Sequence, residues 1–164
     1  MNDKRWRIEH AQVVDSSDFA LFQQYSIIPS VQPTHAISDA PWALSRLGIS
    51  RLRYAYNYKR LLGYSNMLAL GTDFPVEVMD PLRTFYTAVF RKEFKDGSET
   101  FAANESLTAI QALYGMTVWA AVSNFEEAEI QKTLTALTEA DVNESIMVDA
   151  SHGNSQKEFK KQKE

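Results

Sequence analysis

The sequence predicts an α/β protein built around a parallel sheet. Short apolar runs alternate with segments whose apolar residues recur at helical spacing, which is typical of parallel strands joined by helices. One apolar run, Met67–Leu70, ends just before Asp73, in a bend favoured by Gly71 and Pro75. An acid at the carboxyl end of a buried parallel strand occupies the position where α/β enzymes keep their catalytic groups.

The predicted strands are short apolar segments bounded by turn residues, namely Trp6–His10, Ile27–Val31, Met67–Leu70 and Ser145–Val148. The predicted helices follow capping residues or an early proline and carry an apolar stripe. The first runs from Ser16 or Ser17 to Tyr25, and the others are Asp39–Leu47, Ser50–Leu62, Asp80–Arg91, Ser106–Val122 and Glu126–Ala140. The residues Phe94–Glu99 are predicted to form a polar loop.

Composition excludes several classes of protein. A chain of 164 residues that is 45% hydrophobic can bury one ordinary core. A net charge of -4 leaves no electrostatic footprint for nucleic acid. The absence of cysteine excludes disulfides, thiolate metal sites and a cysteine nucleophile. No apolar stretch reaches the ~18 residues of a membrane span, and the polar start is unlike a signal peptide. We therefore expect a cytoplasmic protein without a membrane or nucleic-acid partner.

Polar residues capable of chemistry follow the predicted strands. The three histidines, His10, His35 and His152, and the acid Asp73 all fall at or after a strand end. One such residue is most often a cap or a surface group, but four favour a clustered site at one edge of the sheet.

Imidazole and carboxylate groups are the ligands that hold a catalytic Zn²⁺ or a related ion. His10 suits the role of a ligand, and Asp73 suits that of a ligand or a general base. Catalytic zinc usually has three protein ligands, so these two leave the site incomplete; the chain has no HxH pair and no HExxH. A Ser-His-Asp triad is disfavoured because no serine lies in a G-x-S-x-G turn.

Four segments resemble the amidohydrolase superfamily in order and spacing, and most closely the branch that includes N-substituted formamide deformylases. They are Arg7–Gln12, Pro29–Ala36, Arg51–Tyr56 and Leu68–Glu77. The resemblance spans residues 5 to about 129. It implies a metal-dependent (β/α)₈ TIM barrel that hydrolyses non-peptide C–N bonds in small amide or formamide-type substrates.

The resemblance also implies roles for individual residues. It makes His10 a metal ligand after strand six, Asp73 the catalytic aspartate and a ligand after strand eight, and His35 a residue on the substrate side. The implied cofactor is a divalent metal, Zn²⁺ being the expected ion. The family's remaining ligands, including an HxH pair, would precede Met1, so the chain resembles a partial barrel of the last three βα units.

The end of the chain resembles a different family. Residues 130–164, and in particular Ser151–Ser155, are similar to class I 3-deoxy-7-phosphoheptulonate synthase, whose motif makes His152 a metal ligand. We therefore expect a partial amidohydrolase barrel over residues 1–129 and a short helix-strand segment over residues 130–164.

Three hypotheses about function follow. The first is a metal-dependent hydrolase of C–N bonds that is incomplete as this chain. The second is an inactive truncated or fused remnant, whose open sheet edges favour self-association. The third and weakest is an aldol-type transferase activity like that of the synthase.

Overall fold

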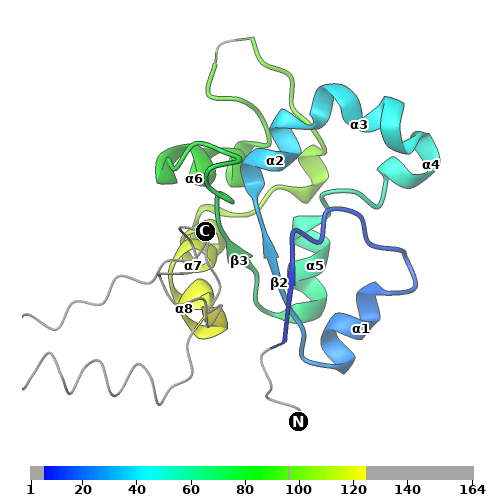
Figure 1. The fold of residues 1–164 in the computed structure, drawn as a ribbon, viewed down its shortest axis with the longest axis vertical. Helices are drawn as coiled ribbons and strands as arrows, with labels where there is room; N and C mark the ends of the chain where they lie inside the picture. The colour runs from blue at the N-terminus through cyan, green and yellow to red at the C-terminus, as the bar shows by residue number, and fades with distance from the viewer. Residues whose placement is uncertain (1–5, 96, 125–164) are drawn as a thin grey trace, which may run out of the picture.

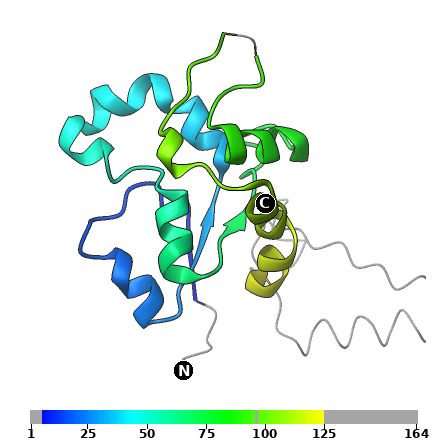
Figure 2. The same ribbon diagram turned by 180° about the vertical axis from the view of Figure 1, so that it is seen from behind.

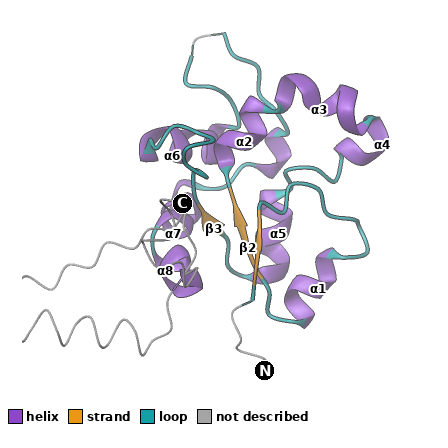
Figure 3. Cartoon of the chain, in the orientation of Figure 1, coloured by secondary structure: helices purple, strands orange, loops and turns teal. Residues whose placement is uncertain are grey.

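The structure, a computed structural model, describes residues 6–95 and 97–124. Its centre is a parallel sheet with the strand order β1-β2-β3 (Figure 3). The strands are β1 (Arg7–Glu9), β2 (Ile28–Val31) and β3 (Ala69–Leu70). In the register Ser30 pairs with Glu9 on one side and with Ala69 on the other. The three strands predicted within this part of the chain are confirmed, whereas the predicted strand at 145–148 and the helix at 126–140 lie outside it.

Helices pack against the sheet and against one another (Figures 1 and 2). Helix α5 packs against β2 and α1, while α7 and α8 pack against β3, and α6 packs against α2 and α7. The helices are α1 (Phe19–Gln24), α2 (Pro33–Ser38), α3 (Ala40–Leu47), α4 (Ile49–Leu52), α5 (Tyr58–Ser65), α6 (Pro81–Phe90), α7 (Ala109–Met116) and α8 (Val118–Asn124), with a 3₁₀ turn, η1, at Ala103–Glu105.

The core lies between the sheet and its helices. Phe19, Tyr58, Leu61 and Leu68 are fully buried there, and burial of each such side chain contributes roughly 1.5–3 kcal/mol. Gly115 permits the close approach of α7 to β3, because a Cβ at this position would lie 2.6 Å from Leu70 Cγ. Helix α7 therefore packs tightly on the strand that leads to Asp73.

The helix predicted over Ser50–Leu62 is wrong, because residues 53–57 interrupt it between α4 and α5. Tyr56 has a φ of 55°, and its N–H donates to the Gln12 carbonyl at 2.7 Å. Ala55 forms an antiparallel bridge with Val13. These contacts with a distant segment override the local helical pattern.

The helix predicted over Ser106–Val122 is also interrupted, at Thr117, where α7 ends and α8 begins. The Thr117 hydroxyl donates to the Leu113 carbonyl at 2.7 Å, a local bond that competes with regular helix. Helix α7 starts at Ala109 rather than Ser106, because Thr108 and Gln111 form a capping box.

Only some of the predicted helix starts have a side-chain cap in the structure. The predicted start of α6 at Asp80 and Pro81 is confirmed, and the Asp80 carboxylate caps the helix by accepting from the N–H groups of Leu82 and Arg83. Asp39 makes no such bond to α3 and instead accepts from the Tyr56 hydroxyl at 2.8 Å. Helix α1 starts later than predicted, after Asp18, and has no side-chain cap. Helix α2 was not predicted, although Pro33 suits a first helical turn.

Among the described residues, no helix is long and apolar enough to cross a membrane.

Candidate metal site

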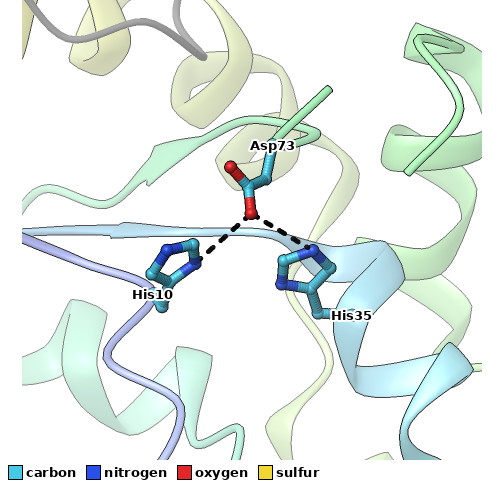
Figure 4. A group of neighbouring side chains, drawn as sticks. All are labelled: His10, His35 and Asp73. Atoms are coloured by element: carbon cyan, nitrogen blue, oxygen red, sulfur yellow. Dashed lines mark ion pairs between the residues drawn. The ribbon is translucent and has the colours of Figure 1, made fainter. Parts of the chain in front are cut away.

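Three residues meet at the carboxyl edge of the sheet, one from each strand connection (Figure 4). His10 follows β1 directly, and its backbone N–H donates to the Ser30 carbonyl of β2 at 2.7 Å. His35 lies in α2, which begins just after β2 ends. Asp73 follows β3, and the turn that carries it closes between the Asp73 carbonyl and the Val76 N–H at 2.8 Å. Parallel pairing of the strands brings these separate segments together.

Gly71 has a different role from the one predicted. Its N–H donates to the Val31 carbonyl at 3.0 Å, which continues the pairing of β3 with β2 instead of starting the bend. The bend begins at Asp73 itself.

The carboxylate of Asp73 faces both imidazole rings. Its Oδ2 lies 3.9 Å from His10 Nδ1 and 3.8 Å from His35 Nε2. The two rings stack with centroids 5.8 Å apart. One ligand atom from each of the three residues lies within 4.8 Å of the other two. Ligands ~2.1 Å from a shared ion at a tetrahedral angle are ~3.4 Å apart, so small side-chain movements would close the three around one cation.

His35 supplies the strongest sign that this edge accommodates a ligand. Its side chain is buried, and its Nε2 has no hydrogen-bond partner in the described part of the chain. An unsatisfied buried polar atom costs roughly 1–3 kcal/mol. A cation between Nε2 and Asp73 would satisfy the nitrogen, so the residues present fit a divalent metal.

The protonation of His35 also fits a ligand. Burial lowers its pKa, since removal from water disfavours the charged ring, although Glu77, Asp73 and Asp39 oppose this effect. The ring is therefore held toward its neutral form, which is the form that binds metals.

The backbone is strained at two of the three residues. The φ angles of His10 and Asp73 are 67° and 57°, in the left-handed region that side chains other than glycine rarely adopt. Such strain costs on the order of 1–3 kcal/mol and clusters at functional sites. At this edge it directs an imidazole and a carboxylate toward each other.

Two glutamines contact the histidine rings. Gln12, two residues after His10, places its Nε2 3.2 Å from His35 Nδ1. Gln32, three residues before His35, places its Oε1 2.9 Å from His10 Nδ1. Each histidine is thus contacted from the segment that carries the other.

Glu77 joins the Asp73 loop to two helices. Its carboxylate accepts a hydrogen bond from the Ser38 hydroxyl at the end of α2. Arg83 of α6 lies 3.4 Å from Glu77 and 2.8 Å from Glu93. These bonds hold the loop against α2, where His35 lies.

The predicted proximity of His10 and Asp73 can be compared with the structure, whereas their predicted roles stay predictions. His10 and Asp73 were predicted to share a site and lie together, and His35, expected on the substrate side, faces the same carboxylate oxygen as His10. His152, the ligand expected from the tail, lies outside the described residues. The contacts of Gln12, Gln32 and Glu77 were missed, although each residue lies in or beside a segment that carried the resemblance.

A sequence model of the amidohydrolase family matches residues 1–134 of this chain. The chain belongs to the amidohydrolase family.

Two proteins are similar to this chain in sequence. Protein LONG AFTER FAR-RED 3 of Arabidopsis thaliana is 36% identical over 124 residues, which are 75% of this chain and 21% of that protein. YtcJ of Bacillus subtilis (strain 168), whose name describes it as an amidohydrolase, is 32% identical over 113 residues, or 68% of this chain and 21% of YtcJ. The chain spans about a fifth of the length of these relatives.

Two solved structures have a similar fold, and both are described as metal-dependent hydrolases. The one from Pyrococcus furiosus has a TM-score of 0.61 and 29% identity, over 71% of this chain and 23% of that chain. The one from Pyrococcus horikoshii OT3 has a TM-score of 0.62 and 32% identity, over 71% of this chain and 24% of that chain.

Proposed function

We propose that this amidohydrolase-family chain forms part of a metal-dependent hydrolase that cleaves non-peptide C–N bonds in small amide or formamide-type molecules. The convergence of His10, His35 and Asp73 on one point at the sheet edge carries the proposal. The similarity to metal-dependent hydrolases of known structure supports it.

The proposed cofactor is a divalent metal ion, most simply Zn²⁺, held by His10, His35 and Asp73. Two neutral imidazoles and a carboxylate are donors that zinc prefers, and three protein ligands leave a fourth position open. Such an ion supplies Lewis acidity and lowers the pKa of water toward ~7.

Asp73 is proposed to act as the general base as well as a ligand. Both of its ion pairs recorded in the described residues use Oδ2, so Oδ1 remains to accept a proton. In the proposed reaction Asp73 takes a proton from water as the water oxygen bonds to the amide carbon. The same proton then passes to the nitrogen as the C–N bond breaks, so that the carboxylate is regenerated.

We also propose that the sheet is a segment of a (β/α)₈ barrel, and that the other strands needed to close it come from outside these residues. A barrel of this kind typically has ~250 residues. The division into residues 1–129 and 130–164 and the synthase-like character of the tail stay predictions, as does a cytoplasmic location. The family match itself continues to residue 134.

The test measures amine release from an N-substituted formamide by the chain purified together with the segment that supplies the remaining barrel strands, before and after chelation of metals. We expect hydrolysis that chelation abolishes and added Zn²⁺ restores, and that Asp73→Asn abolishes because it removes the base. The absence of hydrolysis in metal-saturated protein would instead favour the inactive remnant. Hydrolysis unaffected by Asp73→Asn would refute the assigned base.

A further inference from the structure

Gln12 occupies a position that the proposed reaction does not explain. Its side-chain amide lies 3.2 Å from Nδ1 of His35. The other ring nitrogen, Nε2, is buried without a partner among the described residues and lies 3.8 Å from Asp73. Gln12 therefore contacts the outer edge of a ring whose inner edge faces the candidate metal site.

The backbone of Gln12 is held firmly. Its carbonyl accepts from the Tyr56 N–H at 2.7 Å, and the next residue, Val13, forms a bridge with Ala55. The Val14 N–H donates to the Tyr54 carbonyl at 3.2 Å. These bonds explain the interruption between α4 and α5, and they fix the point from which the Gln12 side chain reaches His35.

A neutral imidazole carries one proton, and the nitrogen that lacks it is the one that can bind a metal. The amide nitrogen of Gln12 faces Nδ1, so Nδ1 accepts and the ring proton lies on Nε2. If the amide turns over, its oxygen accepts from a proton on Nδ1, and Nε2 then presents its lone pair. Glutamine can support both states because its amide carries a donor and an acceptor.

We propose that Gln12 is a positioning residue that fixes the ring of His35 and determines which nitrogen carries its proton, with the amide turning over when a divalent ion binds Nε2. The metal-bound part of this proposal rests on the proposed function. The metal-free part does not, since it concerns the contact already present.

Gln32 does not share this role. Its Oε1 contacts His10 Nδ1 at 2.9 Å, and Nδ1 is the His10 nitrogen that faces Asp73. An ion bound through this nitrogen would replace the Gln32 contact. The proposal is therefore confined to Gln12.

The test uses NMR of ¹⁵N-labelled histidine in the full chain. In the metal-free wild type we expect His35 to carry its proton on Nε2 alone. Gln12→Met keeps the length of the side chain without the amide, so it should give a mixture of the two tautomers, whereas Gln24→Met at an exposed helical position should not. A wild-type His35 with its proton on Nδ1 or with mixed tautomers would overturn the proposal without any variant.

A Zn²⁺ titration tests the metal-bound state. On saturation the wild-type His35 proton should move to Nδ1. Removal of such a contact typically weakens metal binding about 10–100-fold, so Gln12→Met should lose that much affinity, while Gln12→Glu, which still accepts from Nδ1, should retain it within about threefold.

The outcomes separate the two ideas. Equal Zn²⁺ affinity of the wild type and Gln12→Met would refute the role of Gln12 and leave the metal site intact. Failure of the wild type to bind Zn²⁺, with His35 held in one tautomer only when Gln12 is present, would refute the metal site and support the positioning role.

Discussion

His35 Nε2 lies 3.8 Å from Asp73 Oδ2, beyond hydrogen-bond range, and His10 Nδ1 lies 3.9 Å from the same oxygen. The three side chains belong to the segments that follow three different strands, which are far apart in the sequence. A cation at their centre would satisfy the buried nitrogen of His35 and neutralise the carboxylate. The packing that supports Asp73 and His35 should therefore affect metal binding as well as stability.

Gly115→Ala should destabilise the protein by about 1–3 kcal/mol. The new methyl would lie 2.6 Å from Leu70 Cγ and 2.9 Å from the Leu68 carbonyl oxygen, which forces α7 away from β3. Urea unfolding measures the change. Gly63→Ala is the matched control, since no atom of the described residues lies within 4 Å of the Cβ it would add, and it should stabilise α5 by about 0.5–1 kcal/mol. Equal effects at the two glycines would contradict the packing of α7 on β3.

Ser38→Ala should lower the free energy of unfolding by about 1 kcal/mol, because Glu77 loses a hydrogen-bond donor. It should also weaken metal binding, since the Asp73 loop is released from α2. Ser45→Ala is the control: within the described residues the Ser45 hydroxyl bonds only to the Trp42 carbonyl on the surface of α3, and its loss should change little. An unaltered metal affinity in Ser38→Ala would show that this bond does not position Asp73.

The Arg83–Glu93 pair should contribute stability that depends on pH. Hydrogen bonding to Arg83 is the main cause that lowers the pKa of Glu93 below its ordinary value of 4.5. A lowered pKa means that the contribution is complete above the pKa of the unfolded chain and is lost as pH falls through the lower folded value. Glu93→Gln should therefore be less stable than the wild type at neutral pH. The difference should shrink in acid, and a difference that grows as pH falls would contradict this assignment.

The chain should self-associate as its concentration rises. In the described residues β1 and β3 are the edge strands of the sheet. An exposed apolar strip follows Asp73, formed by Phe74, Val76, Val78, Met79 and Leu82. Light scattering should detect the association, and Val76→Lys with Met79→Lys should reduce it, whereas Ile49→Lys on α4 should not. A monodisperse monomer at every concentration would contradict the prediction.

The sequence predicted the strands well because their apolar runs are short and bounded by turn residues. It predicted that His10 and Asp73 lie close together because a polar group directly after such a run lies at the sheet edge. The interruptions at residues 53–57 and at Thr117 were missed. The first depends on bonds to Gln12 and Val13, far away in the chain, which local periodicity does not report.

The supporting residues of the site were missed for a similar reason. Gln12 and Glu77 contact partners on other segments, His35 and Ser38. His35 lies within a helical turn that was not predicted, so the direction of its Nε2 became evident only from the fold. The start of α6 at Asp80 and Pro81 was predicted correctly because it depends only on neighbouring residues.

The shared metal site is tested by titration of the metal-free chain with Zn²⁺ in a calorimeter, which measures the number of ions bound and their affinity. We predict about one ion per chain, with affinity reduced at least about tenfold by Asp73→Asn, which removes a charged ligand. Asp18→Asn, at an exposed position, should leave it unchanged. A chain that binds no Zn²⁺, or an Asp73→Asn variant that binds as tightly as the wild type, would contradict a metal site formed by His10, His35 and Asp73.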